Sequence, residues 1–208
     1  MTAGRPSGAK GRLRTRVEEK LRPLTLPNFI TLVRLGMVPF FLLSVNQGEY
    51  LVALLVFVLA GLTDAMDGAI ARWFDQCSRF GTYLDPIADK VLLVSAYVAL
   101  TVPQGQQVVI PVWLTLLALS RDALIVLVAL VLFLVEDIRT FRPSRWGKAT
   151  TFMHVVTVAV VLFANVTPIP EWIPNGCFTI SLVLVLISGF TYAYRAVRLI
   201  EENRESAA

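Results

Sequence analysis

The stretch "DAMDGAIARWFDQCSRFGTYLDPIADK", residues 64–90, places four aspartates inside a chain that is otherwise strongly apolar. Hydrophobic residues make up 56% of the 208 residues and charged residues only 16%, which is too apolar for an ordinary water-soluble domain. On both sides of this stretch the sequence stays almost free of charge for about 17–25 residues at a time, the length that a helix needs to cross a bilayer. We therefore expect an all-α, polytopic membrane protein.

Six apolar segments have the length of transmembrane helices, and the acidic stretch joins the second to the third. The predicted spans are 28–46, 50–72, 86–103, 108–134, 149–167 and 177–199. Ahead of them, "GRLRTRVEEKLRPL" (11–24) alternates apolar residues with charge at helical spacing, which is typical of an amphipathic helix lying on a membrane surface. The predicted organisation is a basic tail with this interfacial helix (1–24), a six-helix membrane domain (25–200) and a short cytoplasmic tail (201–208).

The distribution of basic residues predicts the orientation of the chain. Lys and Arg gather in the N-terminal tail, in the loops after the second and fourth spans and after the last span, whereas "NQGE", "PQGQQ" and "NVTPIPEWIPNG" contain none. Because basic loops stay in the cytoplasm, we expect both termini and the acidic stretch at the cytoplasmic face of the inner membrane. The net charge of +4 then indicates anionic membrane lipids as partners and no nucleic acid.

Cysteine and histidine contribute little to the prediction. Cys77 and Cys177 fall near opposite membrane faces, which excludes a disulfide between them because a bilayer core is about 30 Å thick. His154, the single histidine, lies in an apolar span, where we expect a packed or hydrogen-bonded side chain in preference to a catalytic base.

Helix geometry brings the four acids together. The second span ends and the third begins at the cytoplasmic face, so Asp64 and Asp67 are expected at the same depth as Asp85 and Asp89. The spacings of three and four residues place each pair on one helix face, about 4.5 and 6 Å apart along the axis. Four like charges near a membrane need a cation between them, and carboxylate oxygens are the ligands that Mg²⁺ and Mn²⁺ prefer.

Small residues flank these acids. Gly68 and Gly81 leave the helix surface bare, so that a bulky ligand can approach the backbone, and Arg72 offers a guanidinium that can hold a phosphate by two hydrogen bonds. A metal-dependent site that handles phosphate is the favoured interpretation. Two alternatives remain open here, an ion or proton pathway through the membrane and close helix packing through small residues. The outer halves of the two spans, "YLVALLVFVLAGL" and "LLVSAYVALTV", are almost wholly apolar, which favours a pocket open on one side over a pathway.

The pattern D-x2-D-G-x2-A-R-x8-G-x3-D-x3-D in this stretch resembles the signature of the CDP-alcohol phosphotransferase family, with every interval intact. "LPNFITLVR" (26–34) and "PSRWGKATT" (143–151) are similar to the starts of that family's first and fifth helices. The resemblance implies a six-helix, homodimeric enzyme that displaces CMP from CDP-diacylglycerol with an alcohol, using two Mg²⁺ or Mn²⁺ ions per active site. It implies metal ligands at Asp64, Asp67, Asp85 and Asp89, with Asp89 also the general base, and contacts to the CDP moiety from Pro27, Asn28, Gly68, Ala71, Arg72, Ser78 and Gly81.

The acceptor alcohol is the least determined part of this prediction. The chain looks most like the branch of the family that contains phosphatidylglycerol phosphate synthase, which implies glycerol 3-phosphate, and cardiolipin synthase, which implies phosphatidylglycerol. "LSRDALIVLVAL" (119–130) departs from the former, where Glu is usual in place of Asp122. Four basic residues are candidates to bind an anionic acceptor, Arg121, Arg142, Arg145 and Lys148, of which Lys148 is favoured. For Arg142 and Arg145 the alternative is a role in membrane topology only. For Arg121 the alternative is a structural ion pair with the adjacent Asp122.

Overall fold

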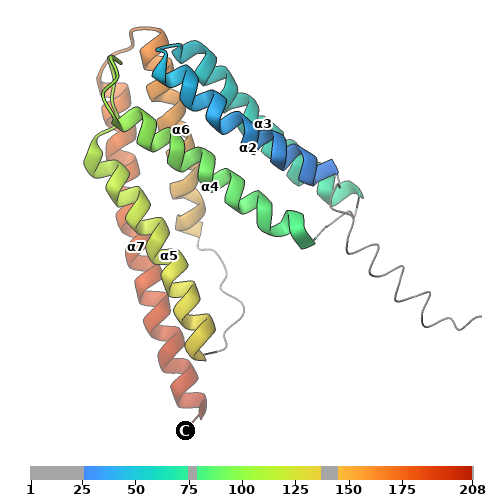
Figure 1. The fold of residues 1–208 in the computed structure, drawn as a ribbon. Helices are drawn as coiled ribbons and strands as arrows, with labels where there is room; N and C mark the ends of the chain where they lie inside the picture. Colours follow the sequence, from blue (N-terminus) through green and yellow to red (C-terminus); the bar gives the residue numbers. More distant parts are fainter. Residues whose placement is uncertain (1–25, 75–78, 137–144, 208) are drawn as a thin grey trace, which may run out of the picture. The chain divides into compact units, whose positions relative to one another are not determined.

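The computed structural model describes residues 26–74, 79–136 and 145–207, and these residues form six helices and no strand (Figure 1). The expectation of an all-helical chain is confirmed. The predicted interfacial helix (11–24) and Ser78 lie outside the described residues. The helices, in chain order, are α2 (Leu26–Asn46), α3 (Tyr50–Phe74), α4 (Arg79–Thr101), α5 (Val112–Glu136), α6 (Arg145–Val166) and α7 (Trp172–Ala207).

Each predicted span corresponds to one of these helices, with differences at the ends. Helix α4 begins at Arg79, several residues before the predicted start at 86, because helical hydrogen bonding continues through polar sequence that hydropathy alone does not mark. Helix α7 continues to Ala207, so residues 201–207 of the predicted tail are helical. Helix α5 begins at Val112 and not at 108. Pro111 directly precedes it, and Asn165 of α6 binds the backbone of the segment before it.

Asn165, near the end of α6, takes up the backbone groups of the segment that leads into α5. Its side-chain oxygen accepts hydrogen bonds from the backbone N–H groups of Gln107 (2.8 Å) and Val108 (3.0 Å), and its Nδ2 donates to the carbonyl of Val108 (2.9 Å). The N–H of Ile110 donates to the carbonyl of Leu100 at 3.0 Å. Because these partners satisfy backbone groups of the segment, it does not need helical hydrogen bonds.

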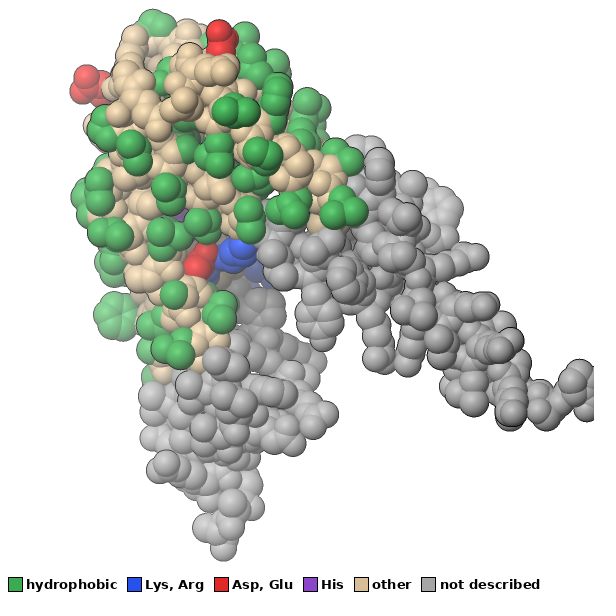
Figure 2. Space-filling model, viewed as in Figure 1, with side chains coloured by type: hydrophobic (Ala, Val, Ile, Leu, Met, Phe, Trp, Pro, Cys, Tyr) green, Lys and Arg blue, Asp and Glu red, His purple; other side chains and the backbone are tan. Residues whose placement is uncertain are grey.

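Two of the helical segments are long and apolar enough to cross a membrane, Arg145–Val166 and Trp172–Tyr194, in a search restricted to the described residues. Shorter apolar stretches occupy Thr31–Asn46, Tyr50–Thr63 and Lys90–Thr101. Large apolar side chains lie on the described surface, including Phe190 with 75% of its surface exposed and Val126 with 68%, and Figure 2 shows them widely distributed. Such a surface suits a lipid environment; that all six helices cross the membrane stays a prediction.

The chain divides into two compact units. The first contains α2 up to Phe40 and the described residues of Val58–Leu92, and the second contains Phe41–Phe57 and the chain from Leu93 onward. In the second unit α7 packs against both α5 and α6 (Figure 1). The Thr157 and Ser181 hydroxyls are hydrogen-bonded at 2.9 Å, and the Thr150 hydroxyl donates to the carbonyl of Leu184 at 3.1 Å. These pairs advance along α6 as they retreat along α7, so the two helices run antiparallel.

A glycine ends α2. Gly48 has a φ of +76°, its N–H donates to the carbonyl of Val45 at 3.1 Å, and the next N–H, that of Glu49, donates to the carbonyl of Ser44 at 2.9 Å. These two hydrogen bonds form a Schellman motif, in which the residue after the helix adopts the left-handed conformation that glycine tolerates best. The tight reversal into Tyr50, the first residue of α3, depends on this conformation.

Gly48→Ala is therefore expected to lower the free energy of unfolding by about 1 kcal/mol, the cost of placing a Cβ in the left-handed region. No neighbouring atom lies within 4 Å of the position that this Cβ would take, so the effect is conformational and not steric. The measurement is the thermal midpoint of the detergent-solubilised protein. Gly176→Ala is the matched control, because Gly176 lies inside helix α7 with equally open surroundings, and we expect its midpoint to stay unchanged or rise slightly. Equal midpoints for Gly48→Ala and the wild type would contradict this account of the turn.

Candidate active site

The four motif aspartates lie on two consecutive helices of the first unit. Asp64 and Asp67 are in the last part of α3, and Asp85 and Asp89 are in the first part of α4. Only residues 75–78 separate the two helices in the sequence, so we expect α3 and α4 to run antiparallel. Asp64 lies ten residues before the end of α3 and Asp89 ten residues after the start of α4, so each is about 15 Å along its helix from the connection.

This arrangement fits the chemistry of a hard divalent cation. The donors that the two helices carry are carboxylate oxygens, and the helical spacing within each pair puts both members on one face of their helix. The same two helix segments carry the other motif residues, Gly68, Ala71, Arg72 and Gly81. The side chains of all these residues, and of Pro27 and Asn28 in the first turn of α2, lie outside the described residues, so their roles stay predictions.

Arg34 is a polar residue of the first unit to which the sequence argument gave no role in the site. It lies on α2, one turn after Thr31, and both side chains are buried, with 1% and 0% of their surface exposed. A buried guanidinium requires compensating partners, so its burial identifies Arg34 as a constrained position of the helix bearing Pro27 and Asn28. The signal in the sequence was a single arginine within an apolar span.

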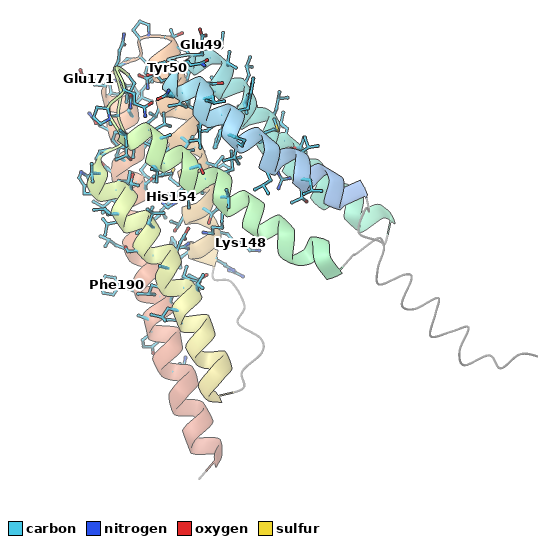
Figure 3. The ribbon with its side chains drawn as sticks, in the orientation of Figure 1. Glu49, Tyr50, Lys148, His154, Glu171 and Phe190 are labelled. Carbon is cyan, nitrogen blue, oxygen red and sulfur yellow. The ribbon has the colours of Figure 1, made fainter. Side chains whose placement is uncertain are left out.

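Three of the candidate acceptor-binding residues have different surroundings, and the fourth, Arg142, lies outside the described residues. Arg145 and Lys148 are exposed in the first turn of α6, where Figure 3 shows Lys148 near the start of that helix. Arg121, on α5, is only 7% exposed, and its Nη1 donates to Asp122 Oδ1 at 2.7 Å. Its Nη2 donates to the carbonyl of Gly147 at 3.3 Å, which brings Arg121 to the turn that carries Lys148. The ion pair supports the structural interpretation of Arg121.

The two ends of the second unit differ in charge. Lys148 lies in the first turn of α6, whereas Glu171 follows the end of that helix, and Figure 3 shows Glu49 and Glu171 at the end away from Lys148. His154, between these ends, is 3% exposed, and its ring lies 5.1 Å from that of Tyr97, so the prediction of a packed histidine is confirmed. Cys177 is a free, partly buried cysteine, and Cys77 lies outside the described residues.

Comparison with known proteins places the chain in a family. The family model of the CDP-alcohol phosphatidyltransferases matches residues 24–192, a range that includes the whole aspartate motif and Lys148. The chain belongs to the CDP-alcohol phosphatidyltransferase family. The resemblance inferred from the motif is thereby confirmed, and the protein is an enzyme of the class that forms phospholipids from CDP-linked precursors.

Relatives within the CDP-alcohol phosphatidyltransferase family fall into two kinds. A probable phosphatidylglycerophosphate synthase of Mycobacterium tuberculosis is 33% identical over 196 residues, which covers 91% of this chain and 90% of the relative. A cardiolipin synthase (CMP-forming) of Streptomyces coelicolor is 37% identical over 160 residues, covering 73% and 70%. The human cardiolipin synthase (CMP-forming) is 43% identical over 105 residues, covering 50% of this chain and 34% of that protein. Both kinds of relative act in lipid synthesis, and their different products leave the acceptor open.

Proposed function

We propose that this CDP-alcohol phosphatidyltransferase transfers the phosphatidyl group of CDP-diacylglycerol to glycerol 3-phosphate and releases CMP. The observation that carries the proposal is the intact eight-position motif within a family match that extends over most of the chain. The similarity to a probable phosphatidylglycerophosphate synthase over nearly the full length of both chains favours glycerol 3-phosphate. The second candidate is cardiolipin synthesis from phosphatidylglycerol, which is favoured by the higher identity to the human and rat cardiolipin synthases over half of the chain.

In this proposal the motif aspartates hold the metal ions, and one of them also acts as the general base. Asp64, Asp67, Asp85 and Asp89 would hold two Mg²⁺ or Mn²⁺ ions, which when bound neutralise the diphosphate and the charge that develops on departing CMP. Asp89 accepts the proton of the acceptor hydroxyl as its oxygen attacks the phosphorus of the lipid. The bond between that phosphorus and the bridging oxygen breaks, and CMP leaves with the bridging oxygen.

The remaining motif residues bind the CDP moiety. Gly68, Ala71 and Gly81 present little side-chain bulk, which lets the nucleotide and its phosphates approach the helix backbone. Arg72 binds phosphate oxygens through its planar guanidinium. Pro27, Asn28 and Ser78 complete the nucleotide site in this proposal.

The proposed cellular setting is the cytoplasmic side of the inner membrane. Six helices of the domain 25–200 would cross the membrane, with the interfacial segment 1–24 and both termini on the cytoplasmic side, and the enzyme would act as a homodimer. The two helices long enough to span a bilayer, the apolar described surface and the opposite charge of the two ends of the second unit support this arrangement. A site at this face can receive a lipid substrate from the bilayer and a charged acceptor from the cytosol.

The decisive experiment offers purified protein CDP-diacylglycerol and Mg²⁺ with either glycerol 3-phosphate or phosphatidylglycerol, and measures CMP. We expect CMP release with glycerol 3-phosphate, together with a new phospholipid that carries a terminal phosphate. Release with phosphatidylglycerol alone would identify a cardiolipin synthase. Absence of CMP with both acceptors would refute transfer to either alcohol. Parallel reactions without protein correct for hydrolysis that does not depend on the enzyme.

Lys148→Ala is expected to raise the KM for glycerol 3-phosphate by about tenfold, the loss that corresponds to one charge-assisted hydrogen bond. The KM for CDP-diacylglycerol should change little, because the proposal assigns Lys148 to the acceptor only. Arg198→Ala is the control, since Arg198 is an exposed cation on another helix, α7. An increase confined to the KM for the lipid substrate would remove Lys148 from the acceptor site.

A further inference from the structure

One buried arginine connects three helices of the second unit. Arg121 of α5 donates from Nε and Nη2 to the hydroxyl of Ser188 on α7, at 3.2 and 2.8 Å. Nη2 also donates to the carbonyl of Gly147 on α6 at 3.3 Å, while Nη1 donates to Asp122 at 2.7 Å. The guanidinium carbon lies 5.6 Å from the ring centre of Tyr192, one turn beyond Ser188 on α7. We call Arg121, Ser188 and the Gly147 carbonyl the α5–α7 clasp.

The surroundings of this clasp favour its hydrogen bonds, of which the one from Nη2 to Ser188 is the shortest, at 2.8 Å. Ser188 is fully buried, and Arg121 borders a groove of about 320 Å³ whose other lining residues, such as Leu124 and Val185, are mostly apolar. In such low-dielectric surroundings a hydrogen bond to a charged group is strengthened, and an unpaired charge is costly. Asp122 neutralises the guanidinium, and its carboxylate would repel an anionic acceptor that approached Arg121 directly. Direct binding of the acceptor phosphate by Arg121 is therefore disfavoured.

The clasp acts on the turn that carries the proposed acceptor residue. Gly147 immediately precedes Lys148, and its carbonyl is the atom that Arg121 holds. One turn further along α6, the Thr150 hydroxyl donates to the carbonyl of Trp146 in its own helix at 2.8 Å and shares this hydrogen with the carbonyl of Leu184 on α7 at 3.1 Å. These two contacts in successive turns constrain the height and the rotation of the start of α6. Rotation decides the direction in which the exposed Lys148 projects.

We propose that Arg121 is a positioning residue, which holds the first turn of α6 against α7 so that Lys148 faces the anionic acceptor. The inference rests on the acceptor role proposed for Lys148. An arginine suits this position because its planar fork can reach Ser188, Gly147 and Asp122 at once, whereas the single ammonium of a lysine cannot span all three directions. The sequence showed only that Arg121 lies beside the acidic Asp122. The contacts favour a role in orienting α6 over direct binding of the acceptor.

The test compares three variants of the full-length protein, Ser188→Ala, Arg121→Lys and Ser181→Ala. Ser181 is the matched control, since it is also a fully buried serine of α7 whose hydroxyl bonds to α6, but through Thr157 in the middle of that helix. Two quantities are measured: hydrogen–deuterium exchange of peptides covering the start of α6, without substrate, and the KM values for acceptor and CDP-diacylglycerol. We expect Ser188→Ala and Arg121→Lys to accelerate exchange at the start of α6. Both variants should raise the acceptor KM about tenfold with little change for the lipid. Ser181→Ala should do neither.

Each other result overturns the inference. Unchanged exchange in Ser188→Ala would show that the clasp does not hold α6. Faster exchange with an unchanged acceptor KM would show that the clasp is structural only. A raised acceptor KM in Arg121→Lys but not in Ser188→Ala would indicate that Arg121 contacts the acceptor itself. The exchange measurement needs no substrate, so it judges the clasp separately from Lys148→Ala, which judges the acceptor role of Lys148.

Discussion

Purified Asp89→Asn protein is expected to release CMP at least about a hundred times more slowly than the wild type, the usual contribution of a general base. Asparagine has nearly the shape of aspartate but cannot accept the proton of the acceptor hydroxyl, and it removes one negative charge from the proposed metal site. Because the change is nearly isosteric, the helix that carries it should remain folded, and the thermal midpoint should stay close to that of the wild type.

The measurement for Asp89→Asn is CMP release at saturating CDP-diacylglycerol and acceptor, together with thermal unfolding. Glu49→Gln is the control, because it also exchanges a carboxylate for an amide but lies in the turn before α3, in the second unit. We expect it to retain full activity. Turnover of Asp89→Asn at the wild-type rate would refute the general-base assignment, and a collapsed thermal midpoint would instead show that Asp89 is needed for folding.

Removal of divalent cations is expected to reduce CMP release to background. The four carboxylates proposed as ligands, on α3 and α4, would form a donor set suited to Mg²⁺ or Mn²⁺, and without a cation their mutual repulsion and the charge of the diphosphate would both oppose substrate binding. The experiment treats the enzyme with EDTA, measures CMP, and then adds back each cation in excess. Restoration by Mg²⁺ or Mn²⁺ is the expected result, whereas full activity in EDTA would contradict a metal-dependent site.

A substitution among the proposed metal ligands distinguishes a cation that the protein binds from one that arrives bound to the nucleotide. Asp64→Asn should raise the Mg²⁺ concentration for half-maximal activity by about tenfold or more, because even residues that only support metal ligands change affinity by about 10- to 100-fold. Glu171→Gln, a carboxylate change between α6 and α7, should leave the Mg²⁺ requirement unchanged. An identical Mg²⁺ requirement in Asp64→Asn and the wild type would exclude Asp64 as a ligand.

The choice between the two acceptors depends on chemistry that the aspartate motif does not encode. Glycerol 3-phosphate is a small water-soluble anion, whereas phosphatidylglycerol is a lipid that reaches the enzyme within the bilayer. Both would present a hydroxyl to the same base, so the shared motif is compatible with either alcohol. The residues that distinguish the two acceptors must lie around the bound acceptor. Substitutions at the start of α6, and at its contacts with α5 and α7, therefore test the choice of acceptor.

The sequence by itself determined the helices and the candidate catalytic residues. Apolar runs of membrane-spanning length predicted all six helices, since helical hydrogen bonds join residues only four positions apart and depend on local sequence. The aspartate motif could be identified because it, too, depends only on local sequence. Spacings of three and four residues within α3 and α4 define common faces without any knowledge of tertiary contacts.

Tertiary structure alone decided the features that depend on partners distant in sequence. The backbone before α5 is held by Asn165, whose partner Val108 is 57 residues away. Pro111, directly before Val112, is a local signal for the helix start, but a prediction from hydropathy does not use it. The role proposed for Arg121 also rests on distant partners, because Gly147 and Ser188 are 26 and 67 residues away in the sequence. Charge and spacing in the sequence show that a side chain can make an ion pair or bind an anion. Which of these it does depends on the atoms that packing brings within hydrogen-bonding distance, and those atoms belong to other helices.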